Sequence, residues 1–119
     1  MNKTISVVIP AYNEEEGIAA TLEAVKGITG VTAIIVVNDG SSDGTSGVAR
    51  QLGAQVLDLY PNRGKGGAMN AALPHIKTEV VVFLDADLGS SAREAEKLLQ
   101  PVLQQQCDLA IASFPPPTK

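Results

Sequence analysis

VVVFLDADLG, residues 80–89, is the stretch that decides the fold, because five apolar residues lead directly into two aspartates and a glycine. A short, continuously apolar run of this kind is typical of a strand buried on both faces of a parallel sheet. Side chains alternate along a strand, so Asp85 and Asp87 would point to the same side if the strand continued that far. Two carboxylates that close repel each other unless one is protonated or a cation lies between them. The stretch therefore predicts a buried strand that ends at a cation site.

Strands of this type alternate with helical segments along the chain. The predicted strands are 5–10, 32–38, 54–60, 79–85 and 108–113. The predicted helices are 18–28, 44–52, 66–76 and 92–103. This order predicts an α/β fold with a Rossmann-like open parallel sheet and helices on both faces, which binds ligands at the carboxyl ends of its strands.

Two helix starts carry capping patterns. Asn13 with Glu16 predicts the N-cap of the first helix, and Ser91 with Glu94 repeats the pattern before the last one. Pro101 is expected to bend or shorten that last helix.

Composition and charge exclude several classes of protein. A chain of 119 residues suits one compact domain, placed at 1–113, followed by a Pro-rich tail or cut end at 114–119. The net charge is −4 without a basic cluster, which argues against a nucleic-acid partner. No apolar run reaches the length of a transmembrane helix. A single cysteine and the lack of a signal peptide favour a cytoplasmic protein without an internal disulfide.

Polar and glycine-rich segments follow four of the predicted strands. They are PAYNEEE (10–16), NDGSSDGT (38–45), NRGKGG (62–67) and DADLGSS (85–91). The carboxyl ends of parallel strands meet at one edge of a sheet, so these segments predict a ligand site there.

The acidic first segment excludes a dinucleotide site of the usual kind. Three glutamates, 14–16, occupy the turn where such a fold places glycines, and they would repel a pyrophosphate. No GxGxxG or P-loop motif is present. A bound phosphate must be neutralised elsewhere, and Mg²⁺ or Mn²⁺ on one or both aspartates of DADLG would do so. Arg63 and Lys65 add two cations beside accessible backbone N–H groups.

Four ordered motifs resemble a known family. They are VVIPAYNEEEGI (7–18), IIVVNDGSSDGT (34–45), NRGKGGAMNAAL (62–73) and VVFLDADL (81–88). Over residues 4–113 the chain is similar to the N-terminal half of family 2 glycosyltransferases with the GT-A fold. The dolichol-phosphate mannosyltransferase-like and polyprenyl-phosphate sugar transferases resemble it most in pattern.

The resemblance implies a nucleotide-diphosphate sugar donor, with UDP favoured over GDP, and an acceptor such as a polyprenyl phosphate or a saccharide. The implied donor-binding residues are Pro10, Ala11, Tyr12, Glu14, Asp39, Gly40, Arg63, Gly64, Lys65, Asp85 and Ala86. Asp85 and Asp87 match the family's DxD motif, which implies a Mn²⁺ or Mg²⁺ site with Asp87 as the firmer ligand.

The chain departs from the family pattern in two ways. Gly89 stands where many relatives carry a glutamine that helps to hold the metal, and no candidate for the family's catalytic base follows Asp108. The chain therefore resembles a donor-binding half, with the base and the acceptor pocket expected beyond its end. Such a half could expose an apolar patch and self-associate as a homo-oligomer, and a longer form could associate with a membrane.

Two other functions remain open at this point. The first is a non-catalytic nucleotide-binding module. The second is a phosphatase of the haloacid dehalogenase type, in which the first aspartate of a DxD is a nucleophile; that motif usually lies on the first strand, whereas here it follows the fourth. Among the neighbouring residues, Glu15 and Glu16 are expected to be solvated, and Asp43 is expected only to cap a turn.

Overall fold

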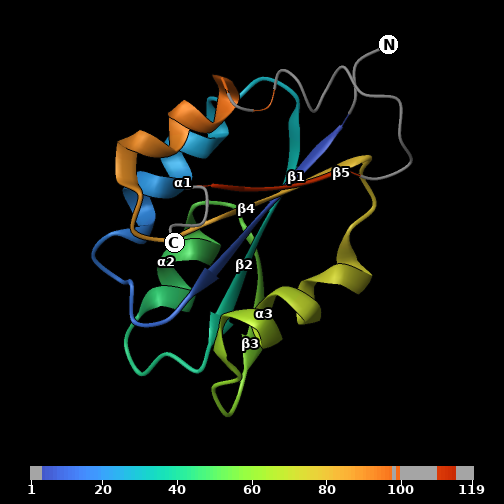
Figure 1. Cartoon of the computed structure of the whole chain (residues 1–119). Helices are drawn as coiled ribbons and strands as arrows, with labels where there is room; N and C mark the ends of the chain where they lie inside the picture. Colours follow the sequence, from blue (N-terminus) through green and yellow to red (C-terminus); the bar gives the residue numbers. More distant parts are fainter. Residues whose placement is uncertain (1–3, 98, 100–109, 115–119) are drawn as a thin grey trace, which may run out of the picture.

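The structure, a computed structural model, describes residues 4–97, 99 and 110–114. Its strands are β1 (Ile5–Ala11), β2 (Val31–Asp39), β3 (Gln55–Leu59), β4 (Val80–Leu84) and β5 (Ala110–Phe114). Its helices are α1 (Ile18–Lys26), α2 (Thr45–Gln51) and α3 (Gly64–Ala72), with the 3₁₀ helices η1 (Leu73–His75) and η2 (Gly89–Glu94). The strands form one parallel sheet in the order β3-β2-β1-β4-β5, which confirms the predicted Rossmann-like fold (Figure 1).

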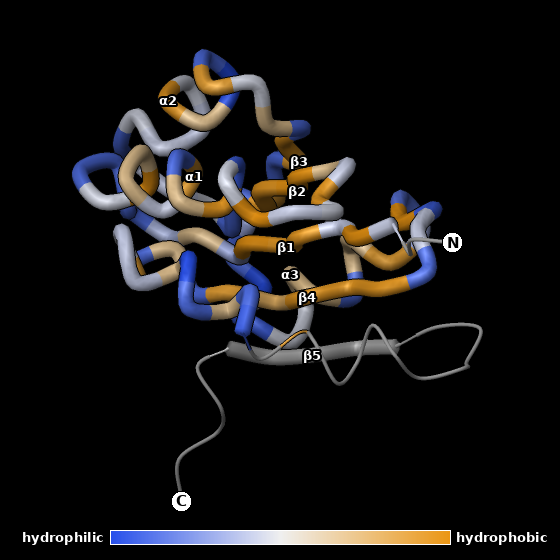
Figure 2. The backbone as a smooth tube through the Cα atoms, turned by 90° about the horizontal axis from the view of Figure 1, so that it is seen from above, coloured by the Kyte–Doolittle hydropathy of each residue, from blue (hydrophilic) through white to orange (hydrophobic). Residues whose placement is uncertain are grey.

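The helices cover both faces of the sheet, with α1, α2 and η2 on one face and α3 on the other (Figure 1). Side chains alternate along the central strands. In β4, for example, Val80, Val82 and Leu84 pack under α1, whereas Val81 and Phe83 pack against α3. Both sides of the strand are thus buried, which explains why β1, β2 and β4 form apolar bands through the centre of the molecule (Figure 2).

The first helix begins later than its predicted cap. Gly17, not Asn13, occupies the N-cap position of α1, and Asn13 has a positive φ of 54°. The Asn13 side chain instead joins two loops, because its Oδ1 accepts a hydrogen bond from the Ser42 N–H at 2.8 Å. The predicted cap was wrong, since asparagine serves a loop as readily as a helix start.

The predicted capping box at Ser91 and Glu94 is also wrong. The helical turn begins at Gly89 as the 3₁₀ helix η2, and the Ser91 hydroxyl inside it donates to the Leu88 carbonyl at 2.6 Å. Residues 95–97 and 99 continue in helical conformation. Pro101 and the only cysteine lie outside the described residues.

The predicted helix 66–76 divides into α3 and η1. Pro74 lies in the first turn of η1, and its lack of a backbone N–H ends the α-helical hydrogen bonding. At the other end of the chain, β5 includes Phe114, the first residue of the predicted tail; residues 115–119 lie outside the described part.

The strand register places the site. Ala11 of β1 pairs with Asn38, Asp39 of β2 pairs with Leu59, and β4 runs in the same direction beside β1. The loops that follow β1, β2 and β4 therefore leave the sheet at one edge, together with the start of α3 (Figure 1).

Candidate functional site

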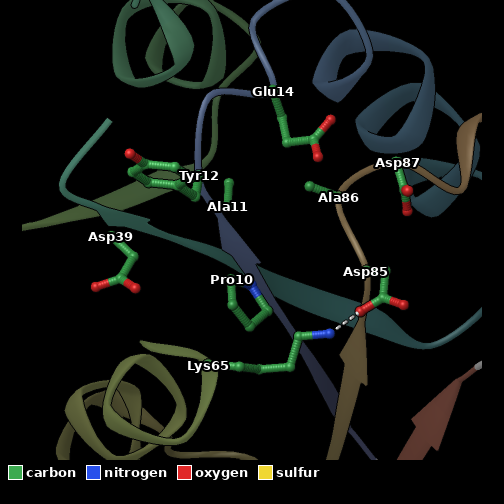
Figure 3. A pocket seen from close by; sticks show the side chains of 9 residues that line it. All are labelled: Pro10, Ala11, Tyr12, Glu14, Asp39, Lys65, Asp85, Ala86 and Asp87. Atoms are coloured by element: carbon green, nitrogen blue, oxygen red, sulfur yellow. Dashed lines mark hydrogen bonds and ion pairs between the residues drawn. The ribbon is translucent and has the colours of Figure 1, made fainter. Parts of the chain in front are cut away.

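A pocket of about 260 Å³ opens at this edge of the sheet (Figure 3). Its lining residues are Pro10, Ala11, Tyr12, Glu14, Asp39, Lys65, Asp85, Ala86 and Asp87. Every one of them is a residue that the sequence assigned to donor or metal binding. Tyr12 and Asp39 lie on one side of the pocket and the two DxD aspartates on the other (Figure 3).

The three remaining predicted residues do not line the pocket; they are Gly40, Arg63 and Gly64. They lie where the end of β2 meets the start of α3. The Arg63 N–H donates to Asp39 Oδ1 at 2.7 Å, and the Gly64 N–H donates to Asp39 Oδ2 at 2.8 Å. Asp39 is only 4% exposed, and its carboxylate thus caps the start of α3 from a neighbouring strand.

The same contact explains Gly40. Its φ is +78°, and a Cβ at this position would lie 3.0 Å from the Asn62 backbone nitrogen. A side chain would therefore force the loops after β2 and β3 apart. The Asn62 side-chain amide donates to the Asp39 carbonyl at 2.8 Å, which adds a third hydrogen bond between the end of β2 and the segment before α3.

Lys65 in the first turn of α3 brings a cation into the pocket. Its Nζ lies 2.6 Å from Asp85 Oδ1 (Figure 3). The two side chains are 63% and 36% exposed, and a pair this accessible to water contributes little to stability. The ammonium group can therefore leave Asp85 for another anion at small cost.

The pocket is electrostatically negative. Its lining includes four carboxylates and one lysine. Partial burial raises the pKa of Glu14 from its ordinary value of 4.5, and the charges of Asp87, Asp43 and Asp85 raise it further. The folded chain thus holds this proton more tightly than the unfolded chain, so the ionisation of Glu14 costs stability as pH rises from 4.5 through the raised pKa. A cation at this site would relieve that repulsion.

The DxD aspartates fit a divalent cation. The carboxylate of Asp87 makes no hydrogen bond or ion pair with the other lining side chains (Figure 3), so its oxygens are available as ligands. Within the described residues, no group of three or more His, Cys, Asp and Glu side chains is arranged to hold a metal. Mg²⁺-type sites commonly have one or two carboxylates and take their other oxygens from water and substrate phosphates. Two aspartates beside an open pocket match that donor set.

Asp85 and Asp87 were predicted to point to the same side of a strand if the strand continued that far, and it does not. Strand β4 ends at Leu84, so Asp85 and Asp87 lie on the turn that follows. They share a pocket because this turn curves over the ends of β1 and β4, not because strand side chains alternate.

The loops after β1 and β2 form a hydrogen-bond network that the sequence did not reveal. The Asn13 N–H donates to Ser41 Oγ at 2.8 Å, and the Glu14 N–H donates to Thr45 Oγ1 at 2.9 Å. Glu15, expected to be solvated, accepts a hydrogen bond from the Gly44 N–H at 3.1 Å. The two segments contain the polar residues for this network, but their spacing along the chain does not predict the partners.

Asp43 belongs to the same network and does more than cap a turn. Its carboxylate accepts hydrogen bonds from the Thr45 hydroxyl, the Thr45 N–H and the Glu15 N–H. The bond from the Thr45 hydroxyl is the main reason that the pKa of Asp43 lies below its ordinary value. The network fixes the backbone that carries Tyr12 and Glu14 into the pocket.

Comparison with known proteins identifies the family. The family model of glycosyl transferase family 2 matches residues 6–118. An uncharacterized protein of Methanocaldococcus jannaschii is 39% identical over 112 residues, which cover 92% of this chain and 46% of that protein. The undecaprenyl-phosphate 4-deoxy-4-formamido-L-arabinose transferase of Serratia proteamaculans is 38% identical over 108 residues, 82% of this chain and 33% of that enzyme.

A solved structure agrees. Glucosyl-3-phosphoglycerate synthase from Mycobacterium tuberculosis, in complex with Mn²⁺, UDP and glucosyl-3-phosphoglycerate, matches with a TM-score of 0.76 and 32% identity. The match covers 87% of this chain and 41% of the synthase. The chain thus spans less than half the length of each of these relatives, and its sheet corresponds to the N-terminal half of a GT-A fold. From the family match and the shared fold, the chain belongs to glycosyl transferase family 2.

Proposed function

We propose that this chain binds the nucleotide-diphosphate sugar donor of a glycosyltransferase, with UDP as the nucleotide and Mn²⁺ or Mg²⁺ held by Asp85 and Asp87. The observation that carries the proposal is the acidic pocket at the carboxyl ends of β1, β2 and β4. A diphosphate would enter a pocket of four carboxylates only together with a cation. The complex of the mycobacterial synthase with UDP and Mn²⁺ supports both the nucleotide and the metal.

The layout of the pocket suits a nucleotide placed across it. Tyr12 is 53% exposed and offers an aromatic face to the base on the side where Asp39 lies (Figure 3). The Asp39 oxygens each accept one backbone hydrogen bond and have a further lone pair for a donor group of the base. The DxD aspartates on the other side would receive the diphosphate end.

Lys65 would exchange partners when the donor binds. In the free chain its ammonium group neutralises Asp85. With a metal at the DxD motif, that ammonium group is free to contact a phosphate oxygen and to stabilise the negative charge of the leaving diphosphate. The bound metal would act there as a Lewis acid.

Transfer of the sugar is proposed for the longer protein that the relatives represent. The undecaprenyl-phosphate relative favours a polyprenyl phosphate acceptor, and hence membrane association at the cytoplasmic face, over a saccharide. No described helix of this chain is long and apolar enough to cross a membrane. If the chain binds the donor but neither transfers nor hydrolyses it, the non-catalytic nucleotide-binding module describes it better.

Calorimetry with the wild-type chain tests the proposal. We expect UDP to bind at least tenfold more tightly in saturating Mn²⁺ than in EDTA, because the metal neutralises the pocket, and GDP to bind more weakly than UDP. The same titrations with Mg²⁺ distinguish the two cations. Equal UDP binding with metal and with chelator would contradict the metal site, and a preference for GDP would contradict the nucleotide.

A further inference from the structure

Thr21 is a buried polar residue of α1, on the side of the helix that meets the turn after β4. Its side chain has no exposure to solvent. A buried hydroxyl destabilises a protein unless it is hydrogen-bonded, so its partners show what it does.

The partners of the Thr21 hydroxyl are the two ends of the turn that carries Asp87. The hydroxyl donates to the Ala86 carbonyl at 2.6 Å and accepts from the Gly89 N–H at 2.8 Å. A hydroxyl has a single proton, so the Gly17 carbonyl at 3.4 Å is the weaker alternative for it. One side chain on α1 thereby bridges residues on both sides of the second DxD aspartate.

These contacts act on the backbone of Asp87 itself. The Ala86 carbonyl and the Asp87 nitrogen belong to the same planar peptide group. The hydrogen bond from Thr21 therefore fixes the orientation of the peptide plane that precedes the Asp87 Cα. Gly89 fixes the turn two residues later, where its φ of +59° is a left-handed conformation. The carboxylate of Asp87 makes no hydrogen bond or ion pair with the other lining side chains, so none of these holds it in place in that way (Figure 3).

From this geometry we propose that Thr21 is the positioning residue of the metal site: its hydroxyl holds the 86–89 turn so that the Asp87 carboxylate faces the pocket before any metal arrives. The inference rests on the proposed function, since it assumes a metal at the DxD motif. Groups that orient a metal ligand without touching the metal change metal affinity by about 10–100-fold when removed. They act by preorganising the ligand.

Gly89 has a corresponding role. A Cβ at this position would meet nothing closer than Ala20 at 4.0 Å. Space does not require glycine here, but the left-handed backbone favours it. In this chain the backbone N–H of Gly89, held by Thr21, takes part in ordering the metal motif.

The test compares Thr21→Val, which has nearly the same shape but no hydroxyl, with Thr21→Ser, which keeps the hydroxyl. Binding of Mn²⁺ is measured by the loss of the free-ion paramagnetic resonance signal, without nucleotide and with UDP. We expect Thr21→Val to weaken Mn²⁺ binding about 10–100-fold. Thr21→Ser should restore it to within about threefold of wild type, and UDP binding in EDTA should stay within about twofold, since only the metal ligand is disturbed.

A matched control separates this role from a general loss of stability. Thr78 is a half-buried threonine whose hydroxyl donates to the Val80 carbonyl at 2.9 Å and lies 2.7 Å from the Ser6 hydroxyl, at the opposite edge of the sheet. Thr78→Val should lower stability without changing Mn²⁺ affinity. If Thr21→Val does not fold, Thr21→Ala provides the same test, because it removes the hydroxyl without placing a methyl group against the Ala86 carbonyl and the Gly89 N–H.

The outcomes are distinct. A folded Thr21→Val or Thr21→Ala variant that binds Mn²⁺ as tightly as wild type overturns the role of Thr21 and leaves the proposed function intact. Equal weakening by Thr21→Val and Thr78→Val also overturns it, because the effect would then be one of stability alone. A wild-type chain that binds no Mn²⁺ overturns the proposed function itself.

Discussion

Asp39→Ala is expected to lower the free energy of unfolding by about 2–4 kcal/mol, because the carboxylate accepts hydrogen bonds from two backbone N–H groups at the start of α3. A hydrogen bond to a charged group contributes about 1.5–3 kcal/mol, and water can replace part of it in the variant. Denaturation in urea, followed by circular dichroism, measures the loss.

Asp39→Ala should also disturb the candidate site. The Asp39 carboxylate holds the N–H groups of Arg63 and Gly64, so its removal releases the start of the segment that carries Lys65 toward Asp85. Asp39→Asn keeps one acceptor oxygen and should lie between wild type and alanine. Glu16→Ala, at an exposed acid of the same edge, is the control and should change stability by less than about 0.5 kcal/mol. If Asp39→Ala were as stable as this control, the capping role of Asp39 would be wrong.

Asp87→Asn is expected to weaken Mn²⁺-dependent UDP binding by at least about 100-fold, which corresponds to about 2.7 kcal/mol. The amide removes a negative charge and a strong oxygen ligand from the DxD motif, and among the described residues no third His, Cys, Asp or Glu side chain is placed to join the two aspartates around a metal. The Asp87 side chain is exposed and makes no hydrogen bond or ion pair with the other lining side chains, so the fold should be unaffected. Calorimetry in Mn²⁺ and in EDTA measures the difference.

The matched control for this variant is Glu79→Gln, which removes one negative charge from an exposed position before β4, at the opposite edge of the sheet. It should bind UDP and Mn²⁺ as wild type does. Asp85→Asn should weaken binding less than Asp87→Asn, since Asp85 is partly neutralised by Lys65 in the free chain. Metal-dependent binding that persists in Asp87→Asn would place the metal elsewhere.

Much of the fold could be predicted because it depends on patterns that are local in the sequence. The apolar run 80–84 predicts a strand covered on both faces, and the structure buries all five of its residues between α1 and α3. Once the strands are parallel, the loops after them must share an edge, and the pocket lies there. The nine lining residues are among those that the resemblance to the family implied for donor or metal binding.

What could not be predicted depends on contacts between distant parts of the chain. Asn13 is a residue type that often caps helices, but its side chain bonds Ser42 in the loop after β2, 29 residues away. The resemblance implied donor binding for Asp39, and nothing in NDGSSDGT shows that its carboxylate also caps α3. Thr21 is an ordinary helix residue in the sequence, and only the fold brings it to a turn 65 residues later.

The most direct test of the account is where Mn²⁺ lies when UDP is bound. At 12.3 kDa the chain suits nuclear magnetic resonance, in which a paramagnetic ion broadens the signals of the amides nearest to it. Small additions of Mn²⁺ to the UDP-saturated chain should first broaden the amides of Asp85, Ala86, Asp87 and Leu88, and then that of Lys65. Broadening centred away from this pocket, for example on the charged surface residues Arg93, Glu94, Glu96 and Lys97, would contradict a metal held by the DxD motif.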